Sequence, residues 1–297
     1  MCFKSHSMAL LLATSAGLPL TACEDTIPDA GSRFGRDAGR PDTGNFQIDA
    51  GSNDGGILDG GPQCNPTGIE VCDDTDNDCN GLIDDVDEGA DGIYDCLSIA
   101  LLGSPGANPT SNFEMWLDSN GVNVTRIQTG TASLTRAILD AYDIVILDRL
   151  VRDYDPSEAA ILEDWLTAGG GLMSMSGYAN DTPSIARPNS LLANIGIEYL
   201  PGLTNGPVTM FVPHAITSSI TSVTFIGGFV VGTTTAALQA EALASVAAGP
   251  VGVIEHHGAG RAFAWGDEWI SFDSEWQGNP DVPRFWANIL GWLAGFR

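Results

Sequence analysis

Short apolar segments that alternate with helix-like segments constrain the fold of this chain more than any other feature. Four of them have the length and composition of buried strands, at residues 97–102, 122–127, 143–147 and 172–175. The segments between them have helix-like patterns, at residues 112–119, 134–141 and 156–167. Continuous apolar strands separated by helices are typical of a parallel sheet covered by helices on both faces. Residues 97–297 are therefore predicted to form one α/β domain with a mainly parallel sheet.

The second half of this domain is less regular. Residues 208–212 and 222–231 are β-branched runs, which favour strands. Residues 251–256 and 261–265 are separated by a Gly-Ala-Gly turn and predict a hairpin. Residues 282–293 carry large apolar side chains on one helical face, and they predict a closing helix.

A twelve-residue acidic loop, Asp76 to Asp87, has the ligand spacing of a calcium loop. Gly81 stands at position 6, where the chain must turn sharply. Ligands that contain only oxygen suit calcium, a hard cation, better than zinc or copper. The predicted ligands are the side chains of Asp76, Asp78, Asn80, Asp84 and Asp87 and the carbonyl of Leu82.

The loop departs from the usual calcium pattern in two ways. Position 12 is Asp87 rather than the longer Glu, and Pro and Gly residues stand where flanking helices would be. The alternative interpretation is an acidic turn exposed to solvent. The spacing is also compatible with a divalent ion other than calcium.

Four cysteines bracket this loop: Cys64, Cys72, Cys79 and Cys96. An even number of closely spaced cysteines in an exported chain predicts two disulfides, with three pairings open. A zinc site is the competing interpretation, but a second closely spaced cysteine pair is missing and no His is nearby. Residues 64–96 are therefore expected to be a small disulfide-held metal-binding segment.

Residues 70–85 read E-V-C-D-D-T-D-N-D-C-N-G-L-I-D-D. They resemble the MopE-type metal-binding motif, E-x-C-D-G-x-D-N-D-C-D-G-x-x-D-E, which recurs in secreted and lipid-anchored proteins of myxobacteria and their relatives. The resemblance implies metal binding in a myxobacterial-type lipoprotein. The family label mentions copper, but the loop holds no soft ligand if its thiols are oxidised.

The N-terminus predicts export. Lys4 precedes an apolar run, and residues 20–23 read Leu-Thr-Ala-Cys, which resembles a bacterial lipobox. Residues 1–22 are therefore expected to be a signal peptide, with Cys23 acylated to anchor the chain to the membrane. This predicts an exported, lipid-anchored protein of the bacterial cell envelope, at the outer membrane. A plain secretory signal is the alternative.

Residues 23–63 are rich in Gly, Asp and Ala, and this composition predicts a disordered acidic tether. The whole chain has a formal net charge of −26 at pH 7. Such a charge argues against nucleic acid as a partner. Lys4 is the only lysine, which excludes a Walker phosphate loop and lysine-based catalysis from the mature protein.

Residues 168–177 read A-G-G-G-L-M-S-M-S-G, and residues 213–217 read P-H-A-I-T. Together with Gly260-Arg261 and Trp265-Gly266-Asp267, they resemble the class I glutamine amidotransferase-like, flavodoxin-related domains of the trehalose-utilisation type. The resemblance implies a three-layer α/β fold. Active amidotransferases carry a Cys on a strained strand-to-helix turn, and the matching residue here is Ser176.

The candidate catalytic residues are few. Ser176 would need a base, and His214 and His257 are the candidates for it. Asp267 and Glu268 lie among tryptophans, where carboxylates could bind a sugar or act as acid and base. The alternative is a structural role, in which these carboxylates cap a helix and the aromatic residues cover the rim of the sheet.

We expect a catalytically degenerate domain that binds rather than reacts, since no Cys follows Cys96 and no base is evident from the sequence. Its ligand would be a small molecule, a glycan or a protein. One alternative is a hydrolase that uses Ser176 with a His, or a carboxylate site at Asp267 and Glu268. Another is a purely structural surface protein.

Overall fold

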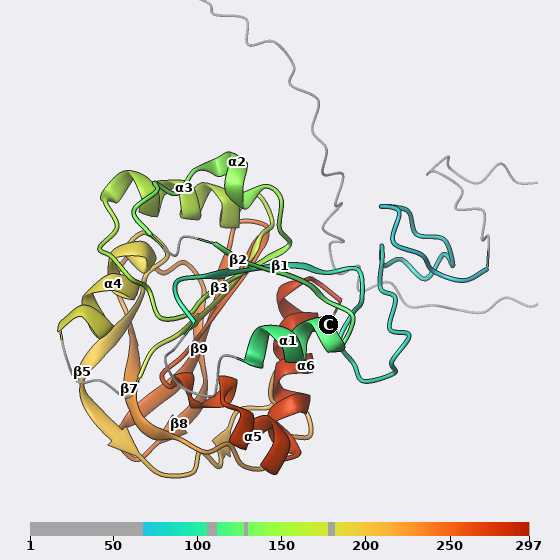
Figure 1. Cartoon of the computed structure of the whole chain (residues 1–297). Coiled ribbons are helices and arrows are strands. Elements are labelled where there is room, and N and C mark those ends of the chain that lie inside the picture. Colours follow the sequence, from blue (N-terminus) through green and yellow to red (C-terminus); the bar gives the residue numbers. More distant parts are fainter. Residues whose placement is uncertain (1–67, 106–111, 128–129, 178–181, 297) are drawn as a thin grey trace, which may run out of the picture. The chain divides into compact units, whose positions relative to one another are not determined.

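The computed structural model describes residues 68–105, 112–127, 130–177 and 182–296 (Figure 1). The predicted signal peptide, Cys23, the tether and Cys64 lie outside these residues. In the described part of the chain, no helix has the length and apolar character that crossing a membrane requires.

A mixed sheet with strand order β2-β1-β3-β4-β10-β9-β8-β6 forms the centre of the domain. The first five strands of this order run parallel, and the last three are antiparallel to their neighbours. Their bounds are β1 Ser98–Leu102, β2 Asn123–Ile127, β3 Ile144–Leu147, β4 Gly171–Met175, β6 Met210–Phe211, β8 Ala240–Val246, β9 Gly249–His257 and β10 Gly260–Trp265.

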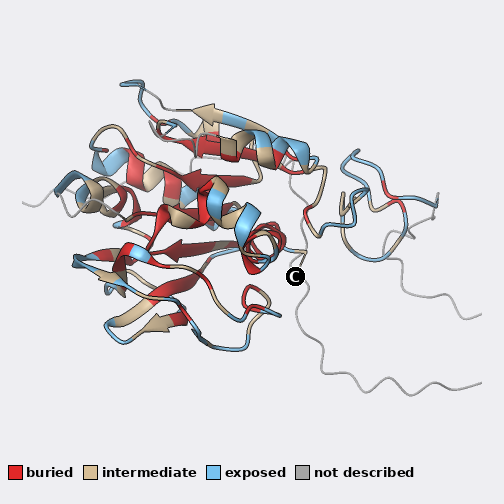
Figure 2. Cartoon of the chain, turned by 60° about the horizontal axis from the view of Figure 1, so that its bottom comes forward, coloured by how far each residue is buried: buried red, intermediate tan, exposed pale blue. Residues whose placement is uncertain are grey.

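Helices cover both faces of this sheet. On one face, Ile99 and Leu101 of β1 pack with α1 (Phe113–Ser119) and α6 (Asp281–Leu293). On the other, Ala100 and Leu102 pack in a second core. Its outer elements are α2 (Arg136–Leu139), α3 (Pro156–Thr167), α4 (Thr182–Leu192) and the ribbon of β5 (Ile197–Asn205) and β7 (Ile226–Thr233). The alternation of side chains along β1 thus produces three layers, with buried residues concentrated between them (Figure 2).

The predicted fold class is confirmed, and the four predicted strands of the first half match β1 to β4 within two residues. The predicted helix at 134–141 is shorter, spanning Arg136–Leu139. The sequence did not predict α4, which contains Pro188, nor β8, whose Ala and Glu residues favour helix. Pairing of β8 with β9 overrides that local preference.

A disulfide joins Cys72 to Cys96, two residues before β1. Cys79 is also bonded in a disulfide. Between this segment and the sheet, Ile93 is buried in the core next to α1 and α6, and Tyr94 packs against Phe296 with ring centroids 4.3 Å apart.

Candidate functional site

A cavity of about 450 Å³ lies at the carboxyl edge of the parallel strands. Since β1, β3, β4 and β10 run in the same direction and in close register, the residues that follow them meet at one edge. Ser104 follows β1, Arg149 follows β3, Ser176 follows β4 and Glu268 follows β10, and all four line the cavity. Arg187 of α4 contributes to the opposite wall.

The Ser176 hydroxyl has a structural partner. Its Oγ donates a hydrogen bond of 2.6 Å to the carbonyl oxygen of Ser184 in α4. In a regular helix this carbonyl would accept from the backbone N–H of residue 188, but residue 188 is a proline and has no N–H. Ser176 therefore supplies the donor that Pro188 lacks, and its proton is directed at a carbonyl rather than at a base.

The candidate bases lie at the other end of the sheet. His257 pairs with Gly260 at the start of β10, whereas Met175, which precedes Ser176, pairs with Trp265 at the end of β10. Five strand residues separate these two levels, or roughly 16 Å. The His257 ring lies 3.5 Å from Glu163 and 3.8 Å from Glu255, with Nε2 and Nδ1 as the nearest atoms.

His214 is also remote from Ser176. Its ring packs edge-on against Trp292 at a centroid distance of 5.4 Å, as does the ring of His256. Arg261, in the first half of β10, donates to the Trp292 carbonyl at 2.6 Å, which puts this cluster near the amino edge of β10. Burial lowers the pKa of His214, so its neutral form is favoured. The structure therefore does not bring Ser176 together with His214 or His257.

Among the residues that line the cavity, Arg149 has a strained backbone conformation. Its φ of 53° is in the left-handed region, which a long side chain rarely adopts, whereas Ser176 is not among the described residues with positive φ. Gly103, which follows β1, packs tightly against this backbone. A Cβ atom at Gly103 would lie 2.0 Å from the Asp148 carbonyl oxygen. The strained residue is therefore Arg149 at the end of β3, and not Ser176 at the end of the neighbouring strand β4.

The Arg149 guanidinium is available to a ligand. It stacks over the Phe272 ring at 5.4 Å, and among the described residues no acceptor takes a hydrogen bond from it. The neighbouring carboxylate of Asp148 is held instead by Arg126, with Nη2 and Oδ2 3.1 Å apart, and Arg126 also pairs with Glu114. Burial raises the pKa of Asp148, against the opposing effect of Arg126.

One oxygen of the Glu268 carboxyl group has no hydrogen-bond partner among the described residues. Its side chain is only 8% exposed, and its Oε2 makes no hydrogen bond among the described residues. Gly177 leaves the room for it, because a Cβ at Gly177 would lie 2.8 Å from this oxygen. Burial raises the pKa of Glu268, and the positive charge of Arg149 opposes this shift.

Asp267 does not line the cavity. Its carboxylate accepts from the backbone N–H of Trp269 at 3.0 Å, which caps the short helix η2 (Glu268–Ser271), and from Ile226 at 2.6 Å. It therefore links the end of β10 to β7. Burial raises its pKa to about 7, even though both backbone hydrogen bonds favour the charged form.

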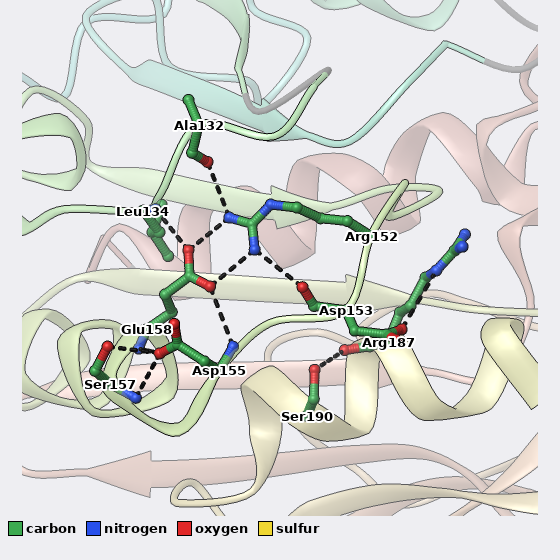
Figure 3. A network of polar contacts seen from close by, with 9 residues as sticks. All are labelled: Ala132, Leu134, Arg152, Asp153, Asp155, Ser157, Glu158, Arg187 and Ser190. Carbon is green, nitrogen blue, oxygen red and sulfur yellow. Dashed lines mark hydrogen bonds and ion pairs between the residues drawn. The ribbon is translucent and has the colours of Figure 1, made fainter.

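The loop between β3 and α3, which carries Arg149, is held in place by a partly buried ion pair (Figure 3). The Arg152 guanidinium contacts both oxygens of Glu158, at 2.5 and 2.8 Å. Glu158 also accepts from the backbone of Leu134 and Asp155, and the Arg152 hydrogen bond is the main cause of its lowered pKa. Arg187 donates to the Leu150 carbonyl at 3.0 Å, which fastens α4 to the same loop.

In the acidic loop, the structure brings Asp76 and Asp78 together with Glu70, and one oxygen of each lies within 4.8 Å of the others. Glu70 is buried and accepts from the backbone of Asn77, Asp78 and Asp84. The sequence pattern did not include Glu70, since it precedes the twelve-residue window. Gly81 has a φ of 93°, as its position in the turn required.

All the predicted side-chain ligands take part in hydrogen bonds within the segment, and Asp76 and Asp78 both accept from the Asn80 backbone N–H. Asp84 accepts from the backbone of Asp73 and Asp74, and Asp87 accepts from Asp91 and Gly92. Asn80 accepts from the Leu82 backbone N–H through its side-chain oxygen. In this arrangement Asp84 and Asp87 stabilise neighbouring turns and do not join Glu70, Asp76 and Asp78.

Sequence reasoning missed three residues of these sites. Arg149 follows a correctly predicted strand, so the rule that ligands bind at carboxyl ends could have identified it. Arg187 is on the unpredicted helix α4, and nothing in the sequence indicated its position. Glu70 was visible as the first residue of the recognised motif, but no calcium-loop position corresponds to it.

No family model matches the sequence, and no curated protein matches it. Among solved structures, the mmIFT52 N-terminal domain matches 66% of this chain and 97% of its own, with a TM-score of 0.54 and 15% identity. The cytoplasmic protein STM1381 from Salmonella typhimurium LT2 has a TM-score of 0.48 and 16% identity, covering 66% of this chain and 99% of its own. A ThuA-like protein from Bacteroides uniformis has a TM-score of 0.46 and 14% identity, covering 66% and 91%. The likeness to the mmIFT52 domain agrees with the α/β fold and extends no further than the fold.

Proposed function

We propose that the α/β domain is a binding module that holds a small polar molecule in the cavity at the carboxyl edge, on a catalytically degenerate amidotransferase-like scaffold. The observation that carries this proposal is the Ser176 hydroxyl. It lines the cavity, but it donates to the Ser184 carbonyl. A serine nucleophile needs a base to take its proton, and the histidine candidates lie near the opposite edge of the sheet.

Blocking the cavity tests this proposal. Ser184 lines the cavity on α4, and Ala186 of the same helix is exposed. The full-length protein would be screened against a library of small polar metabolites by ligand-observed NMR. We expect wild type and Ala186→Trp to bind the same compounds and Ser184→Trp to lose them. Equal binding by Ser184→Trp would move the site away from this cavity.

The hydrolase alternative predicts covalent labelling of Ser176. Intact protein would be treated with a fluorophosphonate probe beside a Ser176→Ala control. We expect no labelling in either protein. Labelling of wild type that disappears in Ser176→Ala would establish the hydrolase in place of the binding module. The alternative carboxylate site at Asp267 and Glu268 is disfavoured, because Asp267 is committed to two backbone N–H groups.

A second proposal concerns the acidic loop, which we infer to bind calcium through Asp76, Asp78 and Glu70. The closeness of their three oxygens supports it, since such carboxylates repel one another without a cation. Calorimetry on the oxidised full-length protein should detect calcium binding that Asp78→Asn weakens and that Asp118→Asn, at an exposed residue of α1, leaves unchanged. No heat on adding calcium would leave the loop as a solvated turn.

The cellular location is proposed from the lipobox resemblance alone: an exported lipoprotein, anchored through Cys23 to the cell envelope at the outer membrane. Metabolic labelling with a fatty acid in a bacterial host should label wild type and not Cys23→Ser. Absence of label in wild type would favour the plain secretory signal.

A further inference from the structure

We propose that the cavity at the carboxyl edge recognises a small hydroxy acid, such as a sugar acid, with its carboxylate on Arg149 and a neighbouring hydroxyl group on Glu268. This inference rests on the proposed binding function and specifies the chemical class of the ligand. It follows from three features of the cavity: the guanidinium of Arg149, the carboxyl group of Glu268 and the surrounding charge.

Arg149 presents a fork of donors to the cavity. The guanidinium carbon lies 5.4 Å from the centre of the Phe272 ring, and the N–H donors of a guanidinium lie in its plane. No described acceptor takes these donors, and the nearby Asp148 carboxylate is already paired with Arg126. A planar carboxylate matches such a fork with two parallel hydrogen bonds. The left-handed backbone at Arg149 is a cost that this orientation of the side chain would explain.

Glu268 provides a second, different recognition group. Glu268 lines the same cavity, and its buried Oε2 makes no hydrogen bond among the described residues, which is costly for a polar oxygen. Burial favours the protonated carboxyl group, which can donate one hydrogen bond and accept another. A ligand hydroxyl group complements both roles.

The charges around the cavity favour a carboxylate over a phosphate ester. Arg187, the second arginine of the lining, lies 3.7 Å from the Asp153 carboxylate, which offsets part of its charge. Arg149 has no described carboxylate within ion-pair distance, so it balances one negative charge of a ligand, whereas a phosphate ester carries close to two. The chain as a whole is strongly negative, which penalises the second charge further. A volume of about 450 Å³ is within the range of small-molecule sites and suits a monosaccharide-sized ligand.

Calorimetry on the full-length protein tests the proposal with four probes: D-glucuronate, D-glucose, glucose 6-phosphate and acetate. We expect glucuronate to bind about tenfold or more tightly than the other three, because it alone offers one carboxylate and several hydroxyl groups. Arg149→Gln should weaken glucuronate binding about tenfold or more. Arg149→Lys, which keeps the charge and loses the fork, should also weaken it. Arg136→Gln, at a half-exposed arginine of α2 that does not line the cavity, is the control and should match wild type.

Glu268 is tested by two variants. Glu268→Gln keeps a donor and an acceptor and should retain glucuronate binding, whereas Glu268→Leu should weaken it. Thermal unfolding of each variant verifies that the protein is folded.

The outcomes separate the two proposals. Equal binding of glucose and glucuronate, tighter binding of glucose 6-phosphate, or unchanged glucuronate binding in Arg149→Gln would overturn the hydroxy-acid inference and leave the binding module intact. The hydroxy-acid inference would also be overturned, and the binding module retained, if the metabolite screen found only neutral ligands whose binding is lost in Ser184→Trp. Glucuronate binding that Ser184→Trp does not affect would overturn both.

Discussion

At the scale of single residues, the most informative position is Ser176. Its sequence context suggests the nucleophile of an amidotransferase-like enzyme, yet its hydroxyl completes the hydrogen bonding of a helix that contains a proline. The missing N–H of Pro188 and the hydroxyl of Ser176 are complementary parts of one contact. This account gives a mutational test that does not depend on any ligand.

Ser176→Ala should lower the free energy of unfolding by about 1 kcal/mol, because the Ser184 carbonyl loses its donor. Pro188→Ala restores a backbone N–H four residues after Ser184. The cost of Ser176→Ala should therefore be smaller in the Pro188→Ala background. Urea denaturation of the two single variants and the double variant measures this coupling.

The control is Ser119→Ala on α1, where a hydroxyl also donates to a backbone carbonyl, that of Trp116. Its effect should add to that of Pro188→Ala without coupling. Equal costs of Ser176→Ala with and without Pro188 would contradict the proposed exchange of donors.

At the scale of elements, the cavity depends on the loop between β3 and α3. The residues after β3 approach the sheet edge because Arg152 and Glu158 fasten the loop to the first turn of α3. That turn is itself fixed by Asp155, which accepts from Ser157 and Glu158 in a capping box, and by Pro156 at the first helical position. The helix start thus helps to hold the loop that carries Arg149, together with the hydrogen bond from the Ser104 backbone N–H to the Arg149 carbonyl.

Glu158→Gln should lower the free energy of unfolding by about 2 kcal/mol, since it removes the negative charge of Glu158 from its hydrogen bonds with Arg152. Denaturation followed by tryptophan fluorescence measures this. Asp164→Asn, an exposed site on the same helix, should change the stability little. The ion pair would have no anchoring role if the two variants cost the same.

At the scale of the whole molecule, buried carboxyl groups at the sheet edge link folding to pH. The pKa of Asp267 is about 7 in the folded state against an ordinary value of 3.8. Between these values the unfolded state releases a proton that the folded state keeps. Stability from this group is therefore fully present below pH 3.8, declines as pH rises, and is constant above about 7.

Asp267→Asn removes this titration together with the repulsion between Asp267 and the carboxylates of Glu268 and Glu275. Relative to the variant, wild type should lose up to about 4 kcal/mol of unfolding free energy as pH rises through this interval. Urea denaturation at pH 4, 5, 6, 7 and 8 measures the difference. A constant difference across this series would show that Asp267 titrates as it does in the unfolded chain.

Much of the fold was predictable, because its signals are local. The strands β1, β3 and β4 are buried on both faces, so their residues are apolar without alternation. The start of α3 follows from Asp155, Pro156 and Glu158. By contrast, α4 has two prolines and β8 has a helix-like composition, so local preference was misleading for both.

The candidate sites were less predictable than the fold. Ser176 and Glu268 were named from the sequence and line the cavity, but Arg149 and Arg187 were not named. The separation of Ser176 from His257 depends on the antiparallel pairing of β9 with β10, which puts His257 at the amino edge. In the acidic loop, the role of Glu70 comes from the way the chain folds back on itself.

The sequence by itself determined the three-layer α/β class, the acidic and cysteine-rich character of the N-terminal part, and the absence of lysine chemistry after Lys4. Those properties depend on composition and on periodicity within a few residues. Only the tertiary structure decided that Arg149, Ser176 and Glu268 share one cavity and that the histidines do not. The physical reason is that strand order and register arise from pairing between distant segments, and no local pattern encodes which loops will meet.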